Sequence, residues 1–189
     1  NITDYATVNF DALVTIIDDL GGLDMDMSYA EIVHMNNYCV ETSEETDKDY
    51  TPIELPERPD DIEAIQYHYH LNGVQATSYC RIRYTASLDM GRTERQRRVI
   101  QMIVSKAKSA GLSTIFKIMD DVFPMVTTSM DKTEILQMLP TLIGYSVDET
   151  TGFPSSFKFS NVKGSVIVPT SLESNVIELH KFLYGDEAY

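Results

Sequence analysis

Residues 79–110 read YCRIRYTASLDMGRTERQRRVIQMIVSKAKSA. This stretch holds six of the chain's seven arginines, at positions 81, 83, 92, 95, 97 and 98. The 189-residue chain as a whole is acidic, with 29 Asp and Glu against 15 Lys and Arg and a formal net charge of -14. Guanidinium groups are favoured where phosphate or carboxylate is recognised through two parallel hydrogen bonds. The stretch therefore predicts an anion site, most simply a phosphate site.

The second half of this stretch predicts the clearest helix of the chain, Thr93–Ala110, with Gly91 before it allowing a tight turn. Its apolar side chains recur at helical spacing, at Val99, Ile100, Ile103, Val104 and Ala107. The first half, Arg81–Tyr84, is predicted to be extended, so that Arg81 and Arg83 point to the same side.

Steps of three and four residues place two arginines and a glutamine on the apolar face of this helix. The helix dipole opposes arginines at its first turn, and they also repel one another, so a bound anion would relieve both effects. The candidate phosphate-binding residues are therefore Arg81, Arg83, Arg92, Arg95 and Gln96.

The alternative is a structural network in which these arginines pair with carboxylates such as Asp89 and Glu94. We expect Asp89 to orient an arginine rather than to act as a base. Arg97 and Arg98 lie off the apolar face and are predicted to be solvated or paired locally.

Elsewhere, helices and strands alternate along the chain. Before the arginine stretch, the patterns predict a strand at Thr7–Phe10, a helix at Asp11–Leu20, a strand at Leu23–Met27, a helix capped by Ser28, an acidic surface loop at Glu41–Asp61, a strand at Ile65–His70, a turn at Leu71–Gly73 and a short helix at Val74–Tyr79. After it come helices capped by Ser113 and Asp131, strands at Phe157–Phe159 and Ser165–Val168, and a helix at Ser171–Tyr184. This order predicts an α/β layered fold, and the length fits one domain.

Composition excludes some classes of function and leaves others open. The acidic balance argues against nucleic-acid binding, which needs a broad basic surface. His68 and His70 share a strand face at a spacing that metals can use, but no third ligand is near them in the sequence, so we expect a solvated strand face rather than a metal site. Cys39 and Cys80 could form one disulfide or remain two buried thiols, and both readings stay open on the residues alone.

Several blocks, in this order, resemble the LytR-CpsA-Psr family of bacterial cell-envelope enzymes over nearly the whole chain. They are Val8–Phe10 with Ile17–Gly22, Leu71-Asn72-Gly73-Val74-Gln75-Ala76, Arg81-Ile82-Arg83-Tyr84 followed by Asp89, Gly91-Arg92 and Arg95-Gln96, and Val168–Val176 with Leu179–Leu183. The resemblance implies a single domain over 1–189, incomplete at its N-terminus, with a central mixed β-sheet flanked by helices on both sides.

The resemblance also implies a function. Family members are phosphotransferases that move a glycopolymer, such as wall teichoic acid or capsular polysaccharide, from a polyprenyl-pyrophosphate carrier to peptidoglycan. In that role Arg81, Arg83, Arg92 and Arg95 would be catalytic and, with Gln96, would hold the pyrophosphate. A hydrophobic channel would hold the lipid, and Mg²⁺ would assist. Such enzymes are anchored on the outer face of a Gram-positive cell membrane, and an extracellular location would favour a Cys39–Cys80 disulfide.

The family's N-terminal portion carries aspartates that bind metal, and this chain starts after the corresponding point. We therefore expect the Mg²⁺ ligands outside this chain, and we expect the chain alone, a soluble ectodomain piece, not to catalyse transfer. A second hypothesis is a non-catalytic module that binds polyprenyl phosphate or an anionic wall polymer. A third is a structural arginine network with no ligand.

Overall fold

The computed structural model describes residues 3–83, 88–142, 144, 147, 149–161 and 166–185. They fall into two compact units, residues 1–146 and 147–189. The single domain over 1–189 stays a prediction.

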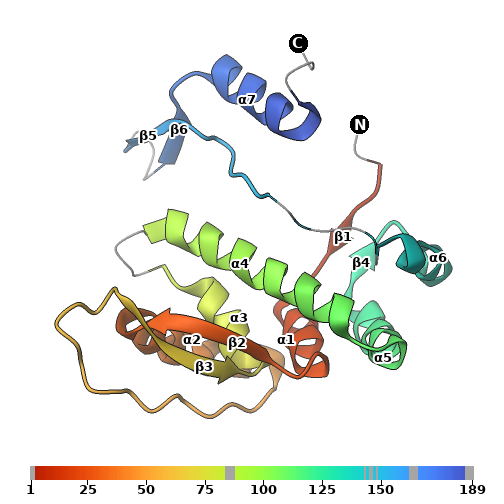
Figure 1. Ribbon diagram of the computed structural model, residues 1–189, viewed down its shortest axis with the longest axis horizontal. Coiled ribbons are helices and arrows are strands. Elements are labelled where there is room, and N and C mark those ends of the chain that lie inside the picture. Colours follow the sequence, from red (N-terminus) through yellow and green to blue (C-terminus); the bar gives the residue numbers. More distant parts are fainter. Residues whose placement is uncertain are drawn as a thin grey trace. The chain divides into compact units, whose positions relative to one another are not determined.

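The first unit holds most of the helices (Figure 1). In chain order its elements are β1 (Ala6–Thr7), α1 (Phe10–Asp19), β2 (Leu23–Ser28), α2 (Tyr29–Thr46), β3 (Ile65–Leu71), α3 (Gly73–Arg81), α4 (Leu88–Ser109), α5 (Leu112–Val122), a 3₁₀ turn (Phe123–Met125), β4 (Thr127–Thr128) and α6 (Lys132–Leu142). The second unit holds β5 (Phe157–Ser160), β6 (Val166–Pro169) and α7 (Leu172–Tyr184). The α/β class is thus confirmed.

The sheet arrangement differs from the predicted central mixed sheet. The described strands form three antiparallel pairs, β1 with β4, β2 with β3, and β5 with β6. The β2–β3 pair packs Met25 and Met27 into the core, whereas its other face exposes Asp24, Asp26 and the two histidines. A strand pair with one charged face is covered by helices on the opposite face only, as is common for antiparallel sheets.

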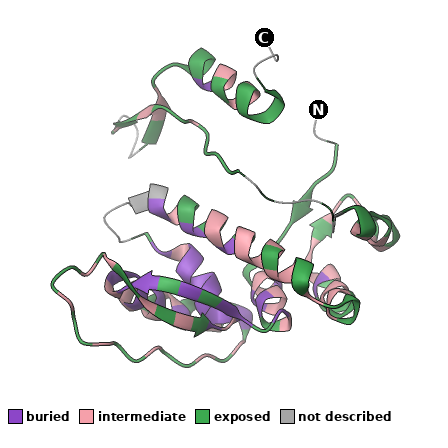
Figure 2. Cartoon of the chain, in the orientation of Figure 1, coloured by how far each residue is buried: buried purple, intermediate pink, exposed green. Residues whose placement is uncertain are grey.

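The core of the first unit lies between the β2–β3 pair and helices α1, α2 and α3. Helix α3 is buried from Gly73 to Cys80, and Figure 2 shows the purple of buried residues gathered in this part of the unit. The segment Leu71–Gly73 is no simple turn, because Asn72 caps α3: its side chain accepts from the N–H of Gln75, and the Gln75 side chain accepts from the N–H of Asn72. This reciprocal capping box starts the helix directly after β3.

Helix α2 begins as predicted and ends later. Ser28 caps it in a capping box with Glu31, and the predicted apolar residues Ile32, Met35 and Cys39 are all fully buried. The helix then continues to Thr46, into the segment predicted as a loop. Its last turns are buried at Thr42 and Thr46, so packing against the core extends the helix through a polar sequence.

The segment that follows, residues 47–64, is tied to the helices beneath it. The Asn36 side chain both donates to the carbonyl oxygen of Ile53 and accepts from its N–H, at 2.8 and 3.1 Å. The Gln75 side chain donates to the carbonyl oxygen of Thr51 at 2.7 Å. These bonds fix the segment across α2 and α3.

Several helix starts differ from the prediction. Asn9 caps α1, so the predicted strand at Thr7–Phe10 shortens to β1. Helix α4 begins at Leu88, and Gly91 lies inside it, buried, instead of forming a turn. Helix α5 follows Gly111 with no side-chain cap, so Ser113 does not have the predicted role.

Two other caps are as predicted. Asp131 accepts from the N–H of Glu134 at the start of α6. In the second unit, Ser171 accepts from the N–H of Ser174 at the start of α7.

Candidate anion-binding site

A cavity of about 1020 Å³ opens in the first unit between α1, α2, the end of α3 and α4. One group of its lining residues is polar: Asn9, His34, Asn37, Tyr38, Glu41, Arg81, Arg83, Arg92 and Gln96. The other group is mainly aliphatic: Val8, Phe10, Leu13, Ile16, Cys80, Val99, Ile100, Ile103 and Val104. The cavity therefore joins a wall rich in cations to a wall of hydrocarbon.

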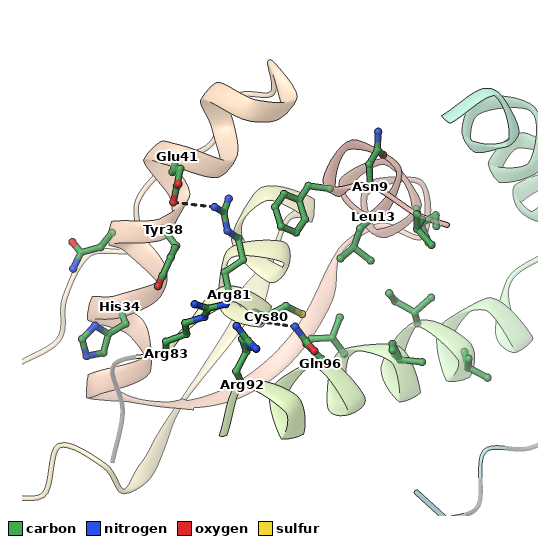
Figure 3. A pocket seen from close by; sticks show the side chains of 18 residues that line it. Asn9, Leu13, His34, Tyr38, Glu41, Cys80, Arg81, Arg83, Arg92 and Gln96 are labelled. Atoms are coloured by element: carbon green, nitrogen blue, oxygen red, sulfur yellow. Dashed lines mark hydrogen bonds and ion pairs between the residues drawn. The ribbon is translucent and has the colours of Figure 1, made fainter. Parts of the chain in front are cut away.

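Four of the five predicted phosphate-binding residues line this cavity. Figure 3 shows Arg83, which follows α3, and Arg92, on α4, pointing toward one another. Gln96 lies one turn further along α4, and its side-chain amide donates to the carbonyl oxygen of Cys80 at 3.4 Å. The predicted strand at Arg81–Tyr84 is absent at residues 81–83, and Tyr84 lies outside the described residues. Arg83 nevertheless lines the same cavity as Arg92 and Gln96.

Arg81 lines the cavity in a different environment. It is the last residue of α3, not part of a strand, and its side chain is 14% exposed. Its guanidinium pairs with Glu41 at 2.9 Å and Glu45 at 2.8 Å, and it lies 4.6 Å from the centre of the Phe10 ring. Two carboxylates therefore already compensate its charge, so at Arg81 the pairing with carboxylates exists, with Glu41 and Glu45 as partners instead of Asp89 or Glu94.

Arg95 lies apart from the other four residues and does not line this cavity. It is 5% exposed and lines a second cavity of about 270 Å³. At about 100° per residue, Arg95 lies roughly 60° to one side of Arg92 and Gln96 roughly 40° to the other. The spacing rule that grouped the three residues was too coarse to separate the two flanks of α4.

The second cavity contains a buried polar cluster. Glu31, 7% exposed, accepts from the Tyr79 hydroxyl at 3.1 Å and lies 3.5 Å from the Arg95 guanidinium. Arg98 donates to the same hydroxyl at 3.3 Å, so the prediction that it is solvated or paired locally was wrong. Burial, followed by the charge of Glu31, raises the pKa of Tyr79 well above its ordinary value, so its hydroxyl remains protonated.

The two cysteines are free thiols, buried in the core at 0% and 7% exposure, and the disulfide favoured by the resemblance is absent from the structure. Burial raises the pKa of both, that of Cys80 to about 12. Both thiols are therefore protonated and unreactive at neutral pH.

The two histidines considered as metal ligands lie on the exposed face of the β2–β3 pair. His68 and His70 each contact an aspartate across the strand pair, Asp26 and Asp24, at 2.7 Å. Within the described parts of the chain, no group of three or more His, Cys, Asp or Glu residues could hold a metal ion. The Mg²⁺ that the resemblance implies, with its ligands expected outside this chain, stays a prediction. The Asp89 side chain lies outside the described part of the structure.

None of the helices in the described ranges has both the length and the apolar composition needed to cross a membrane.

Comparison with protein families matches residues 1–162 to the LytR_cpsA_psr family. This match covers most of the chain, and the chain belongs to that family. A curated relative is the polyisoprenyl-teichoic acid–peptidoglycan teichoic acid transferase TagV of Bacillus subtilis (strain 168). The two are 26% identical over 152 residues, which is 77% of this chain and 33% of TagV.

Solved structures share the fold. The crystal structure of B. subtilis TagV superposes with a TM-score of 0.61 at 23% identity, covering 96% of this chain and 63% of that one. TagT bound to LI-WTA gives a TM-score of 0.65 at 17% identity, covering 100% of this chain and 62% of that one. The chain thus spans about a third of the curated relative and less than two thirds of these solved chains.

Proposed function

We propose that this protein takes part in transferring a glycopolymer, of the wall teichoic acid or capsular polysaccharide type, from a polyprenyl-pyrophosphate carrier to peptidoglycan. Family membership and the transferase relative support the reaction class. The observation that carries the proposal is the cavity that joins the Arg83 and Arg92 side chains to a hydrocarbon wall. A polyprenyl-pyrophosphate carrier is complementary to both walls, because its pyrophosphate is anionic and its prenyl tail is apolar.

The cationic wall would bind the pyrophosphate. Phosphoryl transfer is accelerated mainly by positioning the reacting groups and by stabilising negative charge on the phosphate oxygens. Arg83 and Arg92 would supply that charge, with Gln96 as an amide donor. Arg81 would contribute less than its charge suggests, because Glu41 and Glu45 already pair with it.

The hydrocarbon wall would bind the first part of the lipid. Leu13 and Ile16 come from α1, and Ile103 and Val104 come from α4, so the two helices provide facing apolar surfaces. A lipid tail that covers these side chains removes apolar surface from water, which favours binding by about 25 cal/mol for each Å² buried. We place the reaction at the outer face of the cell membrane, where the peptidoglycan acceptor lies.

The proposal is tested with farnesyl pyrophosphate, a short lipid pyrophosphate. A ligand that binds only the folded state stabilises it by about 2.7 kcal/mol at one hundred times its Kd. We expect this probe to raise the melting temperature of the wild type, and farnesol or inorganic pyrophosphate alone to raise it less.

The variant Arg83→Ala/Arg92→Ala should lose that shift. The double variant Arg97→Ala/Lys108→Ala is the matched control, because it removes two cations from outside the cavity. It should keep the shift. Absence of stabilisation in the wild type, or equal losses in the two double variants, would contradict the proposal.

A further inference from the structure

The buried guanidinium of Arg95 contacts the chain directly before a proposed phosphate-binding residue. It donates a hydrogen bond to the carbonyl oxygen of Ile82 at 2.8 Å. Ile82 is fully buried, and the next residue is Arg83, which lines the large cavity. Arg95 itself lines only the small one.

We propose that Arg95 is a positioning residue: it holds the Ile82 carbonyl and thereby sets the direction in which Arg83 enters the large cavity. This inference rests on the proposed function, because it assigns Arg95 a role in the same binding site. It also replaces the direct phosphate contact that the sequence pattern predicts for Arg95.

The segment that leaves α3 is held from α4 at two points. The last carbonyl groups of a helix have no partners within it and need donors from elsewhere. Here Arg95 donates to the carbonyl oxygen of Ile82, and the adjacent Gln96 donates to that of Cys80. Arg81 follows Cys80 and Arg83 follows Ile82 in the sequence. The two hydrogen bonds from α4 therefore fix the backbone that carries both arginines.

Arg95 is in turn fixed by Glu31. The Glu31 carboxylate accepts from the N–H of Ser28 at 3.1 Å and from the Tyr79 hydroxyl at 3.1 Å, so its orientation is set before Arg95 approaches. Arg95 lies 3.5 Å from it and near the face of the Tyr79 ring. A planar guanidinium can meet the carboxylate and the Ile82 carbonyl in two directions at once, whereas a lysine ammonium is a compact point charge.

The buried environment of Arg95 separates positioning from direct binding. Its side chain is 6% exposed, and two of its nitrogens already contact protein groups. Its Nε is buried and has no hydrogen-bond partner in the structure. The Nε–Hε group is therefore a local reporter of Arg95 that does not depend on any ligand.

The test combines arginine-selective NMR with binding. The chain has seven arginines, so the spectrum holds seven Nε–Hε signals that single substitutions can assign. In the ligand-free protein, we expect Arg95→Lys to shift the Arg83 signal. We also expect it to weaken farnesyl pyrophosphate binding about tenfold. Arg98→Lys is the matched control, because Arg98 shares the small cavity but contacts Tyr79 rather than Ile82.

A second variant separates positioning from stability. In Arg95→Lys, the buried Glu31 carboxylate keeps a less well-matched cation, and we expect a lower melting temperature. The double variant Glu31→Gln/Arg95→Met removes both buried charges, and its melting temperature should return toward that of the wild type. The double variant should still show the shifted Arg83 signal and the weaker binding, since nothing holds the Ile82 carbonyl.

Two results would overturn the positioning role. One is an Arg83 signal that is unchanged in both Arg95 variants. The other is an Arg95 signal that moves on ligand addition as much as that of Arg92, which would indicate direct contact. If wild-type protein does not bind the probe, the proposed function fails, while the ligand-free spectra still decide how Arg83 is positioned.

Discussion

Gly73, the first residue of α3, lies so close to Val14 in α1 that a Cβ on Gly73 would be 2.2 Å from the Val14 carbonyl oxygen. The N–H of Gly73 also donates to Asp18 at 2.6 Å. The two helices therefore cross with backbone against backbone, and this crossing places α1 beside the end of α3 at the cavity.

We expect Gly73→Ala to destabilise the fold by about 1–3 kcal/mol, because rigid backbone must move to admit the methyl group. Denaturant unfolding measures the loss. The control is Gly111→Ala, where the nearest atom to an added Cβ is the Ser113 hydroxyl at 3.8 Å. Equal losses in the two variants would show that the α1–α3 contact is not the cause.

Glu41 places a negative charge in the wall of the large cavity, where it pairs with Arg81. Glu41→Gln removes a carboxylate that competes with the pyrophosphate for Arg81. Because a surface ion pair contributes up to roughly 1 kcal/mol, pyrophosphate binding should become about two- to fivefold stronger. Calorimetry at low salt measures the change, and added salt should reduce it. Glu44→Gln, on the exposed side of α2, should have no such effect. Weaker binding by Glu41→Gln would instead show that Glu41 holds Arg81 in its binding orientation.

The buried thiols predict a dependence of stability on alkaline pH. Because burial raises the pKa of Cys80 from 9.0 to about 12, the folded state keeps a proton that the unfolded state loses. The stabilisation is complete below pH 9 and is lost as the pH rises toward 12. Unfolding measured across this window should show the decline, and Cys80→Ala should reduce it.

Alkylation tests the state of the same thiols. Iodoacetamide should modify neither cysteine in the native protein at neutral pH and both in denaturant without reductant. A denatured protein that needs reductant before alkylation would show that Cys39 and Cys80 are joined after all.

Asp24 predicts a dependence at acidic pH with the opposite sign. A hydrogen bond with His70 is the main cause that lowers the pKa of Asp24 below its usual 3.8. The Asp24–His70 pair therefore stabilises the fold fully when the pH is above the ordinary Asp pKa of 3.8. This stabilisation is lost as the pH falls through the lower pKa of Asp24 in the folded state. Carboxyl NMR should show the Asp24 midpoint rising in His70→Gln and staying low in His68→Gln. An unchanged midpoint in His70→Gln would remove His70 as the cause.

Elements with local signals could be predicted from the sequence. Ser28 and Asp131 cap helices as expected, because the chemistry of a cap lies within one helical turn. Asn72 and Gln75 form the same kind of box, and their spacing was available in the sequence. Asn-Gly is also a strong turn signal, and that signal predicts a turn at Leu71–Gly73 instead of a helix cap.

Elements set by tertiary packing could not be predicted. Alternation of Cys80 and Ile82 with arginines resembles a strand, yet α3 continues through Arg81 because its surroundings bury it. Gly91 disfavours a helix by about 1 kcal/mol, and burial within α4 outweighs that preference. The charged residues of the β2–β3 pair alternate with buried ones in the sequence, but alternation alone does not show how many strands share a sheet.

The candidate site divides in the same way. Arg81, Arg83, Arg92 and Gln96, which the sequence pattern groups together, line one cavity, and their binding of phosphate stays a prediction. It could not separate Arg95, because the residue that holds it, Glu31, lies on another helix far away in sequence. Nor could it show that Arg81 is already paired.

Helix α4 lines the large cavity from Arg92 to Val104, a length of about 18 Å at 1.5 Å per residue. A lipid whose phosphate lies between Arg83 and Arg92 can therefore follow the helix only over this distance. Isoprene units more than about 18 Å from the phosphate would not contact the part of α4 that lines the cavity. The cavity would thus act as a fixed-length gauge: affinity should rise with chain length for short prenyl analogues and then reach a plateau.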